Sequence, residues 1–278
     1  MNKEQHSIAL MCRVYSVSRD GFNSWRRRGE SLRSSEDSEL FSVIARIFKK
    51  HNGCYGSPKI THILRSMGHC VGQKRVARLM REYGLKAVKA CIYPPRKNIN
   101  GFAKASPNLI VKMSVERLDQ VWVGDITYIK LANGVWQYLS VIMDRFSRRI
   151  IAWTLSDRRD AGLSVKTIDR AIKNRGYSSG VIFHSDKGSE YIATAFRERL
   201  ARYDIQQSMN RVKEMNDNAF MESFFNSLKL ERIKRQVIET AEQLKHIVSH
   251  YMRYYNHERI HMSIGGISPA SYEQKFNY

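Results

Sequence analysis

The sequence is poor in several features that would point to other classes of protein. It has only 4 cysteines among its 278 residues, and none of them forms a CxxC pair. We therefore interpret Cys12, Cys54, Cys70 and Cys91 as reduced thiols of a cytosolic protein. No run of about 18 apolar residues is present, which argues against a membrane-spanning helix. The first ten residues also lack the apolar core of a signal peptide.

Acidic residues are scarce as well. The chain has 26 Asp and Glu residues against 47 Lys and Arg residues, which gives a net charge of +21. The first 110 residues carry 21 of these basic residues and only 7 of the acidic ones, so the excess is concentrated there. Such an imbalance favours a polyanionic partner, and nucleic acid is the usual one. The alternative is a basic protein whose charge serves solubility alone.

The sequence also lacks a recognisable zinc-binding motif. His51, Cys54, His62, His69 and Cys70 lie close together in the sequence, but their spacing fits no standard zinc pattern. We interpret them as ordinary surface or core residues.

The N-terminal third has helical periodicity. Residues 1–34 predict two short helices, the second of them capped by Ser18, and a Ser-rich linker at 29–37 follows. Residues 35–91 predict a three-helix DNA-binding domain with a helix that begins at the N-cap Ser57 and Pro58. The last helix of this domain carries Lys74, Arg75, Arg78 and Arg81 along its outer face, as a recognition helix requires. A solvated cationic face is the alternative.

Residues 92–118 contain Pro94, Pro95 and Pro107 and little periodicity, so we expect a linker between domains. From residue 121 the pattern changes to strands. Three strand-like runs at 121–130, 135–143 and 150–155 precede alternating helices and strands up to residue 232. The order β-β-β-α-β-α-β-α predicts an α/β domain, residues 119–235, with a mixed five-stranded sheet of the RNase H-like type. A helix and a Gly- and Pro-containing tail are expected over 236–278.

Three acids stand out in this second region. Asp125 lies inside the first strand on the same face as Val121 and Val123, where an unpaired carboxylate is unfavourable. Asp186 ends the fourth strand, which in this topology lies beside the first. Glu222 lies on a helix and shares a polar ridge with residues one turn away. Each acid alone could form an ion pair with a basic residue. Together they predict an all-oxygen site for Mg²⁺ or Mn²⁺, with two ions assisting an in-line displacement at phosphorus.

Several motifs, taken together, resemble those of a known family. They are 124–128 (GDITY), 144–149 (DRFSRR), 184–191 (HSDKGSEY), 217–225 (DNAFMESFF), 255–261 (YNHERIH), 268–270 (SPA), 55–60 (YGSPKI) and 74–80 (KRVARLM). This combination resembles the second-reading-frame product of the insertion-sequence-three family of bacterial transposases, and it spans most of the chain. In that family three acids form a DDE triad with 35 residues between the second and third, the number found here between Asp186 and Glu222.

The resemblance implies that Asp125, Asp186 and Glu222 are catalytic metal ligands of a polynucleotidyl transferase. It further implies donor-end cleavage, strand transfer through a circular intermediate, and a DNA contact at Lys229. We also expect Lys59 to contact DNA. The implied partners are double-stranded DNA at the transposon ends and target, further copies of the chain on DNA, and an upstream-frame protein with its own helix-turn-helix and leucine zipper. The implied location is the bacterial cytoplasm, in association with the nucleoid.

One position departs from the family pattern. Glu190 stands four residues after Asp186, where family members often have Gln. We expect Glu190 to lie on the following turn and to pair with a base such as Lys187 or Arg197 rather than to bind metal. Two other functions stay open from the sequence. They are a DNA-binding regulator of transposition with an inert core and an RNase H-type nuclease, although the basic N-terminal helices argue against a bare nuclease.

Overall fold

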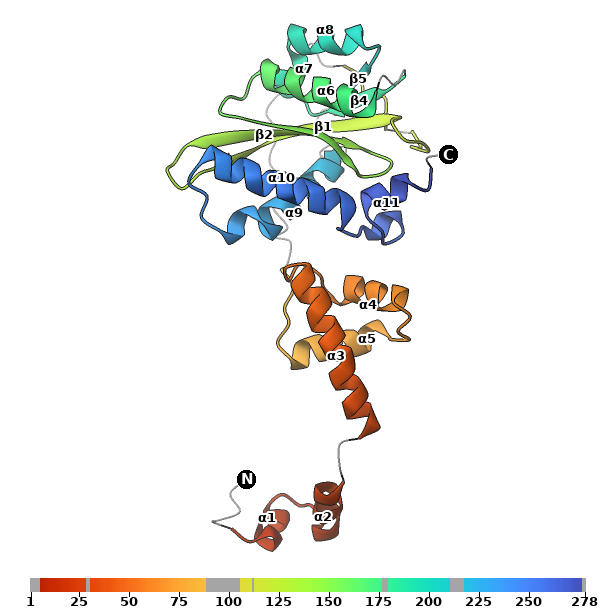
Figure 1. The fold of residues 1–278 in the computed structure, drawn as a ribbon, viewed down its shortest axis with the longest axis vertical. Helices are drawn as coiled ribbons and strands as arrows, with labels where there is room; N and C mark the ends of the chain where they lie inside the picture. The colour runs from red at the N-terminus through yellow and green to blue at the C-terminus, as the bar shows by residue number, and fades with distance from the viewer. Residues whose placement is uncertain are drawn as a thin grey trace. The chain divides into compact units, whose positions relative to one another are not determined.

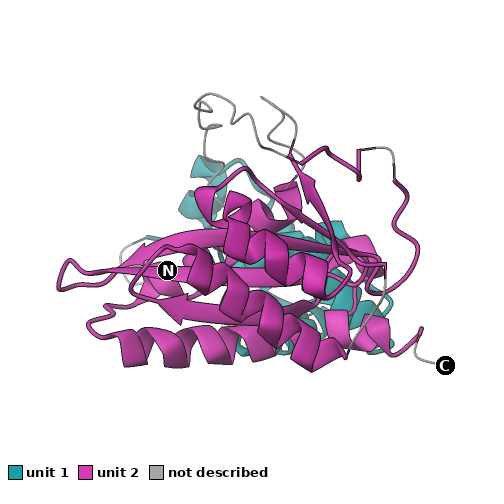
Figure 2. Cartoon of the chain, turned by 90° about the horizontal axis from the view of Figure 1, so that it is seen from above, with its two compact units in different colours: residues 1–86 teal, residues 87–278 magenta. Residues whose placement is uncertain are grey.

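The computed structural model describes residues 6–28, 31–88, 106–111, 113–176, 180–210 and 218–276. The chain divides into two compact units, residues 1–86 and residues 87–278 (Figure 2). The first is built from helices alone in its described residues, and the second is built around a sheet (Figure 1).

The first unit begins with the two predicted short helices, α1 (Ile8–Val14) and α2 (Arg19–Arg27). Ser18 caps the second helix as expected, because its hydroxyl oxygen accepts a hydrogen bond of 3.0 Å from the Gly21 N–H. Cys12 is the one side chain of these two helices that is buried.

A three-helix arrangement follows, with α3 (Leu32–Lys50), α4 (Ser57–Ser66) and α5 (Gln73–Glu82). Its core consists of apolar side chains spaced three or four apart on each helix, namely Leu40, Ile44, Ile47, Ile60, Leu64, Val76, Leu79 and Met80.

Two boundary predictions in this unit are wrong. The expected linker at 29–37 is helical from Leu32, because Ser31 supplies an N-cap whose hydroxyl accepts from the Ser34 N–H. Ser57 is the first residue of α4 rather than its cap, and Gly56 occupies the cap position without a side-chain hydrogen bond. Pro58 lies in the first turn of α4 as predicted, where its missing N–H is not needed.

The second unit contains the predicted mixed sheet of five strands. They are β1 (Val121–Lys130), β2 (Trp136–Asp144), β3 (Ile150–Ser156), β4 (Ile182–Ser185) and β5 (Gln206–Met209), in the spatial order β3-β2-β1-β4-β5. The first three strands pair antiparallel, and β4 and β5 join parallel to β1. The fold class predicted from the sequence is therefore confirmed.

Helices cover both faces of this sheet (Figure 1). One face carries α6 (Ala161–Arg175), α7 (Ser189–Ile192) and α8 (Thr194–Arg202), and the other carries α9 (Ala219–Glu231) and α10 (Ala241–His257). Successive residues of β1 face opposite sides of the sheet. Val121 and Val123 pack with α9 and α10, while Trp122 packs with α6 and α8.

The expected linker at 92–118 belongs to the second unit in its described part. Ile110 is buried in the core beneath α9 and α10, and the Leu109 N–H donates to the Ser208 hydroxyl at 2.9 Å. Met209 donates its N–H to the Pro107 carbonyl, so residues 106–111 lie along β5. The residues from 89 to 105 lie outside the described part of the chain.

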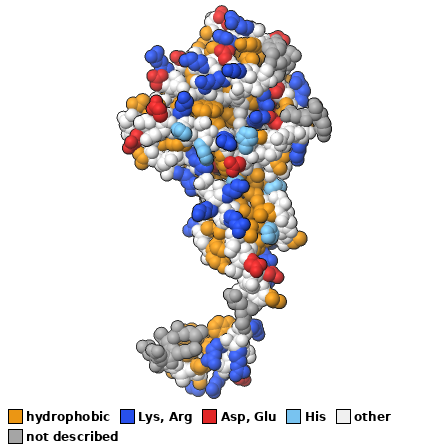
Figure 3. Space-filling model, in the orientation of Figure 1, with side chains coloured by type: hydrophobic (Ala, Val, Ile, Leu, Met, Phe, Trp, Pro, Cys, Tyr) orange, Lys and Arg blue, Asp and Glu red, His pale blue; other side chains and the backbone are white. Residues whose placement is uncertain are grey.

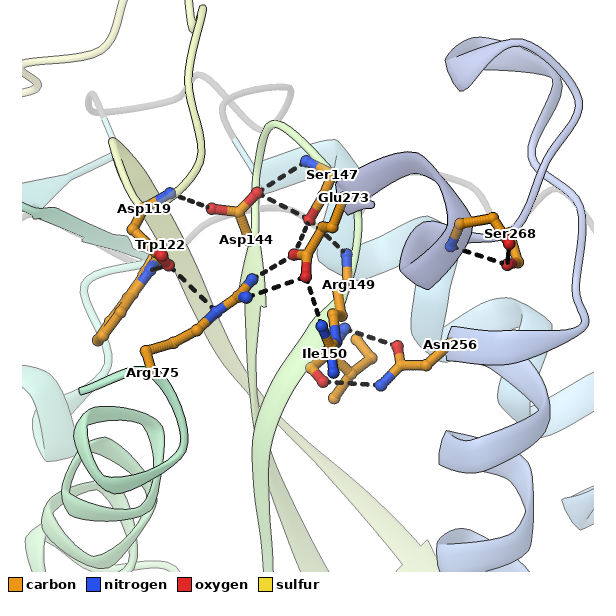
Figure 4. A network of polar contacts seen from close by, with 11 residues as sticks. Asp119, Trp122, Asp144, Ser147, Arg149, Ile150, Arg175, Asn256, Ser268 and Glu273 are labelled. Atoms are coloured by element: carbon orange, nitrogen blue, oxygen red, sulfur yellow. Dashed lines mark hydrogen bonds and ion pairs between the residues drawn. The ribbon is translucent and has the colours of Figure 1, made fainter. Parts of the chain in front are cut away.

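The C-terminal tail is also more ordered than the sequence suggested. After the short 3-10 helices η2 (Ile233–Arg235) and η3 (Met262–Ile264), it forms α11 (Pro269–Glu273). Glu273 is almost fully buried and forms ion pairs with Arg149 at the start of β3 and Arg175 at the end of α6 (Figure 4). Ser147 donates to the same carboxylate at 2.7 Å. The buried polar contacts of Glu273 therefore hold the tail against the sheet domain.

Basic side chains are numerous on the face of the molecule shown in Figure 3. Within the described residues, no helix has the length and apolar character needed to cross a membrane.

Candidate active site

The pairing of β1 with β4 brings Asp125 and Asp186 close together in space. Strands β1 and β4 run parallel, with Val123 opposite His184. Two residues further along the chain in each case, Asp125 lies on β1 and Asp186 directly follows the end of β4, close enough for the charge of Asp186 to act on Asp125. His184 is itself fixed, because its two ring nitrogens lie 2.9 Å from the Ser208 hydroxyl and 2.7 Å from the Asn210 side-chain oxygen.

Asp125 is in an unfavourable environment for a carboxylate. Burial raises its pKa well above the usual range, and the negative charges of Asp186, Glu190 and Glu222 raise it further. A hydrogen bond of 2.7 Å from the Ile126 N–H acts in the opposite direction but does not outweigh these effects. A nearby cation would remove the penalty.

Asp186 lies at the turn after β4. The Gly188 N–H donates to its carboxylate at 3.0 Å. Burial raises the pKa of Asp186, and so does the charge of Glu190, while the Gly188 N–H and Arg159 lower it. A Cβ in place of Gly188 would lie 2.6 Å from the Glu190 carboxylate, so a larger residue there would displace Glu190.

Glu222 projects from the first turn of α9 and is exposed. Partial burial raises its pKa, and its charge contributes to the raised pKa of Asp125. The three acids chosen from the sequence are thus in electrostatic contact through Asp125. Even so, no three His, Cys, Asp or Glu side chains of the described residues are gathered closely enough to hold a metal ion.

Glu190 pairs with a base, as expected, but with a different one from the two examples named. It lies on α7, is 3% exposed, and forms its ion pair at 2.9 Å with Arg159 rather than with Lys187 or Arg197. Arg159 comes from the segment that joins β3 to α6 and reaches the site only through the fold. Its guanidinium offsets one negative charge in a group of four carboxylates, which leaves the others available to a cation.

The start of α9 is anchored beside Asp125. The Asn218 side-chain nitrogen lies 3.4 Å from the Gly124 carbonyl oxygen, and its side-chain oxygen is buried without a hydrogen-bond partner in the described structure. Phe220 supports the guanidinium of Arg148, which lies 3.5 Å from the ring centroid. Burial lowers the pKa of Arg148 to about 10. These contacts hold the helical turn that carries Glu222.

The residues present fit a divalent cation of the magnesium type. All the candidate ligands are oxygens: the carboxylates of Asp125, Asp186 and Glu222, and the unpartnered side-chain oxygen of Asn218 nearby. Hard cations prefer such ligands, and a bound cation would offset the burial that raises the pKa of all three carboxyl groups.

The basic residues predicted to contact DNA fall into three groups. Arg75 and Arg78 both pair with Asp37 of α3, at 2.7 Å and 2.5 Å. Arg78 also pairs with Glu82 at 2.9 Å. These two arginines therefore join α5 to α3, a structural use that the sequence did not predict. Lys74 and Arg81 are exposed on α5, and the described residues give them no ion pair.

The remaining two predicted DNA contacts are lysines over aromatic rings. The Lys59 ammonium lies 4.5 Å from the centroid of Tyr55, and the Lys229 ammonium lies 5.1 Å from that of Tyr128. Both positions leave a basic group beside an aromatic side chain.

Two residues of this region had no usable signal in the sequence. Arg159 lies in the charged run 157–160, which looks like an ordinary polar loop. Arg148 belongs to the recognisable run 144–149, but its contact with Phe220 spans two elements far apart in the chain.

Comparisons with known proteins agree with this architecture. Residues 35–90 match a family described as an HTH-like domain. Residues 116–214 and 222–276 match two families, each described as an integrase core domain. The fold and its matches define the class: a DNA-binding helical unit followed by a polynucleotidyl transferase core of the integrase type.

Full-length relatives give the family. The chain is 34% identical to transposase InsF for insertion sequence IS3A of Escherichia coli K12, over 99% of this chain and 96% of the relative. It is 30% identical to the insertion element IS600 uncharacterized 31 kDa protein of Shigella sonnei, over 96% of this chain and 98% of the relative. The chain therefore belongs to the IS3 family of transposases.

Among solved structures, the chain resembles one in the simian T-cell lymphotropic virus intasome in complex with PP2A regulatory subunit B56 gamma. The identity is 16% and the TM-score 0.48, over 82% of this chain and 73% of that chain.

Proposed function

We propose that Asp125, Asp186 and Glu222 are the catalytic carboxylates and that they bind Mg²⁺ or Mn²⁺, as two ions, during transposition of an insertion sequence. The observation that supports this most is the pairing of β1 with β4, which brings Asp125 and Asp186 close together, while burial raises the pKa of both carboxyl groups. In this proposal the protein cleaves DNA at the ends of the element and joins them to a target.

Each residue of the site has a part in this proposal. Asp125 holds cations from β1, Asp186 does so from the turn that follows β4, and Glu222 completes the ligand set from α9. Divalent ions, when bound, activate an oxygen nucleophile and stabilise the leaving oxygen at phosphorus. Arg159 keeps Glu190 from competing as a ligand because it pairs with that carboxylate. Arg148 and Asn218 hold the first turn of α9 in place.

The basic residues would bring DNA to these acids. Lys59, Lys74 and Arg81 of the helical unit and Lys229 beside the site are the candidates for phosphate contacts. Arg75 and Arg78 remain candidates only if DNA phosphates displace their partner Asp37. Assembly of several copies on DNA, and a partnership with an upstream-frame protein, belong to the same proposal.

The test is substitution of each acid in the full chain, as Asp125→Asn, Asp186→Asn and Glu222→Gln. We expect each to abolish Mg²⁺-dependent cleavage and joining of DNA ends and to spare DNA binding in EDTA. The exposed Glu198→Gln on α8 is the matched control and should keep wild-type activity. Wild-type strand transfer by any one of the three variants would remove that acid from the site.

The same assay separates the second candidate, a DNA-binding regulator with an inert core. Its basis is the absence of a closed metal cluster among the described residues. A wild-type chain that binds DNA ends but neither cleaves nor joins them in Mg²⁺, even with the upstream-frame protein added, would establish the regulator instead.

A further inference from the structure

A cleft of about 770 Å³ opens at the free edge of the sheet, away from the candidate catalytic acids. Its floor is β3, and its walls are the C-terminal halves of α6 and α10. The wall from α10 is one helical stripe, formed by Ser249, Met252, Arg253, Asn256 and His257. The candidate acids Asp125, Asp186 and Glu222 are not among the lining residues.

The lining is strongly basic. It includes Arg149, Arg170, Lys173, Arg175, Arg253 and His257, and none of the described residues that line the cleft is acidic. Cations converge here from three elements that are far apart in the sequence. Basic residues in the last turn of a helix offset its dipole, which accounts for Lys173 and Arg175 but not for Arg170 or Arg253.

Some of this charge is already neutralised and some is not. Arg149 and Arg175 are paired with the buried Glu273 at the back of the cleft (Figure 4). Arg170 donates to the Trp153 carbonyl oxygen at 2.9 Å and to the Thr154 hydroxyl at 3.2 Å, which are neutral acceptors. Lys173 and Arg253 are exposed and have no ion pair in the described part of the chain.

The edge of β3 is closed to an added strand. Asn256 binds both the N–H and the carbonyl of Ile150, as Figure 4 shows. Asn174 donates to the Ile151 carbonyl, and Arg170 occupies that of Trp153. A peptide that extends the sheet would have to displace all of these contacts. A symmetric contact with a second copy would place two cationic clefts together, which is unfavourable.

We propose that this cleft binds the phosphodiester backbone of duplex DNA, as a site separate from the catalytic acids. Lys173 and Arg253 contact phosphates from opposite walls, and Arg170 adds an uncompensated charge between them. The proposed contacts are to phosphates, which carry no sequence information, so the site takes DNA of any sequence. A transposase handles more than one DNA duplex, so a second phosphate-binding surface suits the function proposed above, although its test is independent of catalysis.

The experiment compares two double variants of the full chain. Lys173→Gln with Arg253→Gln neutralises the cleft. Lys166→Gln with Lys245→Gln removes the same charge from exposed positions on the same two helices outside the cleft. Binding to a duplex of unrelated sequence is measured in EDTA at several salt concentrations, after thermal unfolding has shown both variants to be folded.

We expect the cleft variant to lower the slope of log affinity against log salt by about 2, because two phosphate contacts are lost. The matched variant should change the slope by much less. DNA should also protect Lys173, and not Lys166, from chemical acetylation in the wild-type chain, a readout that needs no substitution.

Two results would overturn the proposal. Equal losses in the two double variants, with no selective protection of Lys173, would show diffuse attraction to a basic protein. A cleft variant that binds DNA normally but changes its oligomeric state in sedimentation would show that the cleft faces another copy of the chain. Neither result would affect the assignment of the catalytic acids, which depends on cleavage in Mg²⁺.

Discussion

Single residues at the strand ends decide whether the acids can meet. Gly124, next to Asp125, has no room for a side chain, because a Cβ there would lie 2.3 Å from the Phe183 ring. That ring cannot move away freely, since it packs against Tyr191 and Phe196 with centroids 5.8 Å and 5.2 Å distant. Close approach of β1 and β4 at the site therefore depends on this glycine.

Gly124→Ala should destabilise the second unit by about 1–3 kcal/mol, because either the ring or the strand must shift. Denaturant unfolding measures the change. Gly72→Ala is the control, since nothing lies within 4 Å of its Cβ position. If the clash is the cause, adding Phe183→Leu to Gly124→Ala should restore part of the loss. If Gly124→Ala were as stable as the wild type, the predicted clash between a Cβ at residue 124 and the Phe183 ring would be wrong.

The buried Asp125 carboxylate affects the stability of the metal-free protein. Its folded-state pKa is raised, so the proton is bound more tightly in the folded chain than in the unfolded chain. The contribution to stability is therefore fully present below the unfolded pKa, near 3.9 for an ordinary Asp. It is lost as pH rises through the folded value, so at neutral pH the metal-free protein carries a penalty.

Asp125→Asn should stabilise the metal-free protein at pH 7 by about 1 kcal/mol or more, while it abolishes activity. Calorimetric unfolding measures the stability of both proteins with and without Mg²⁺. Mg²⁺ should stabilise the wild type more than the variant. Asp157→Asn, at an exposed position, should change neither the stability of the metal-free protein nor its response to Mg²⁺. A less stable metal-free Asp125→Asn protein would show that this carboxylate already has adequate partners.

At the scale of elements, the polar network around Glu273 joins segments that are distant in the sequence. Burial alone would raise the pKa of Glu273, but Arg175, Arg149 and Ser147 outweigh it and hold that pKa below the usual range. The network continues through Ser147 to Asp144, whose carboxylate accepts a 2.8 Å hydrogen bond from the Asp119 N–H just before β1 (Figure 4). The tail thus supports the strand that carries Asp125.

Glu273→Gln should destabilise the second unit by about 3–5 kcal/mol at pH 7, because two arginines lose a buried partner. A lowered pKa stabilises the fold above the unfolded value, near 4.3, and this contribution is lost as pH falls through the folded value. Urea unfolding from pH 7 down to pH 2 should show the stability difference between wild type and variant narrowing once the pH falls below about 4.3. The exposed Glu258→Gln is the control, and a gap that stays constant with pH would refute the ionic explanation.

At the scale of the whole molecule, the boundary of the catalytic unit lies earlier than composition suggested. Ile110 is 4% exposed and packs with β1, α9 and α10, and Ser106 and Leu109 hydrogen-bond to β5. The segment before β1 is therefore part of the core that supports the site.

A fragment of residues 106–278 should fold and remain more stable than a fragment of residues 119–278. The expected difference is about 2–5 kcal/mol, the usual loss when a buried Ile is removed. Urea unfolding of the two fragments measures it, and Ile110→Ala in the longer fragment checks the cause. Equal stability of the two fragments would mean that residues 106–118 only rest on the surface.

Much of the site could be predicted because its acids lie on elements with strong local patterns. Alternation along 121–130 placed Asp125 on an inward face, and the run 181–184 placed Asp186 at a strand end. The partners of these residues could not be predicted. The pair of Arg159 with Glu190 depends on where the connection after β3 passes, and the pairs of Arg75 and Arg78 with Asp37 depend on how α3 packs against α5.

The sequence by itself determined the strand and helix order, the three acids with their spacing, the basic N-terminal unit and the family. These follow from periodicity, charge and short motifs, which are local properties of the chain. Only the tertiary structure decided which charges neutralise one another, that the tail and residues 106–111 belong to the core, and that cations from β3, α6 and α10 line one cleft. Such contacts join residues far apart in sequence, and no local pattern specifies which of many similar side chains will meet.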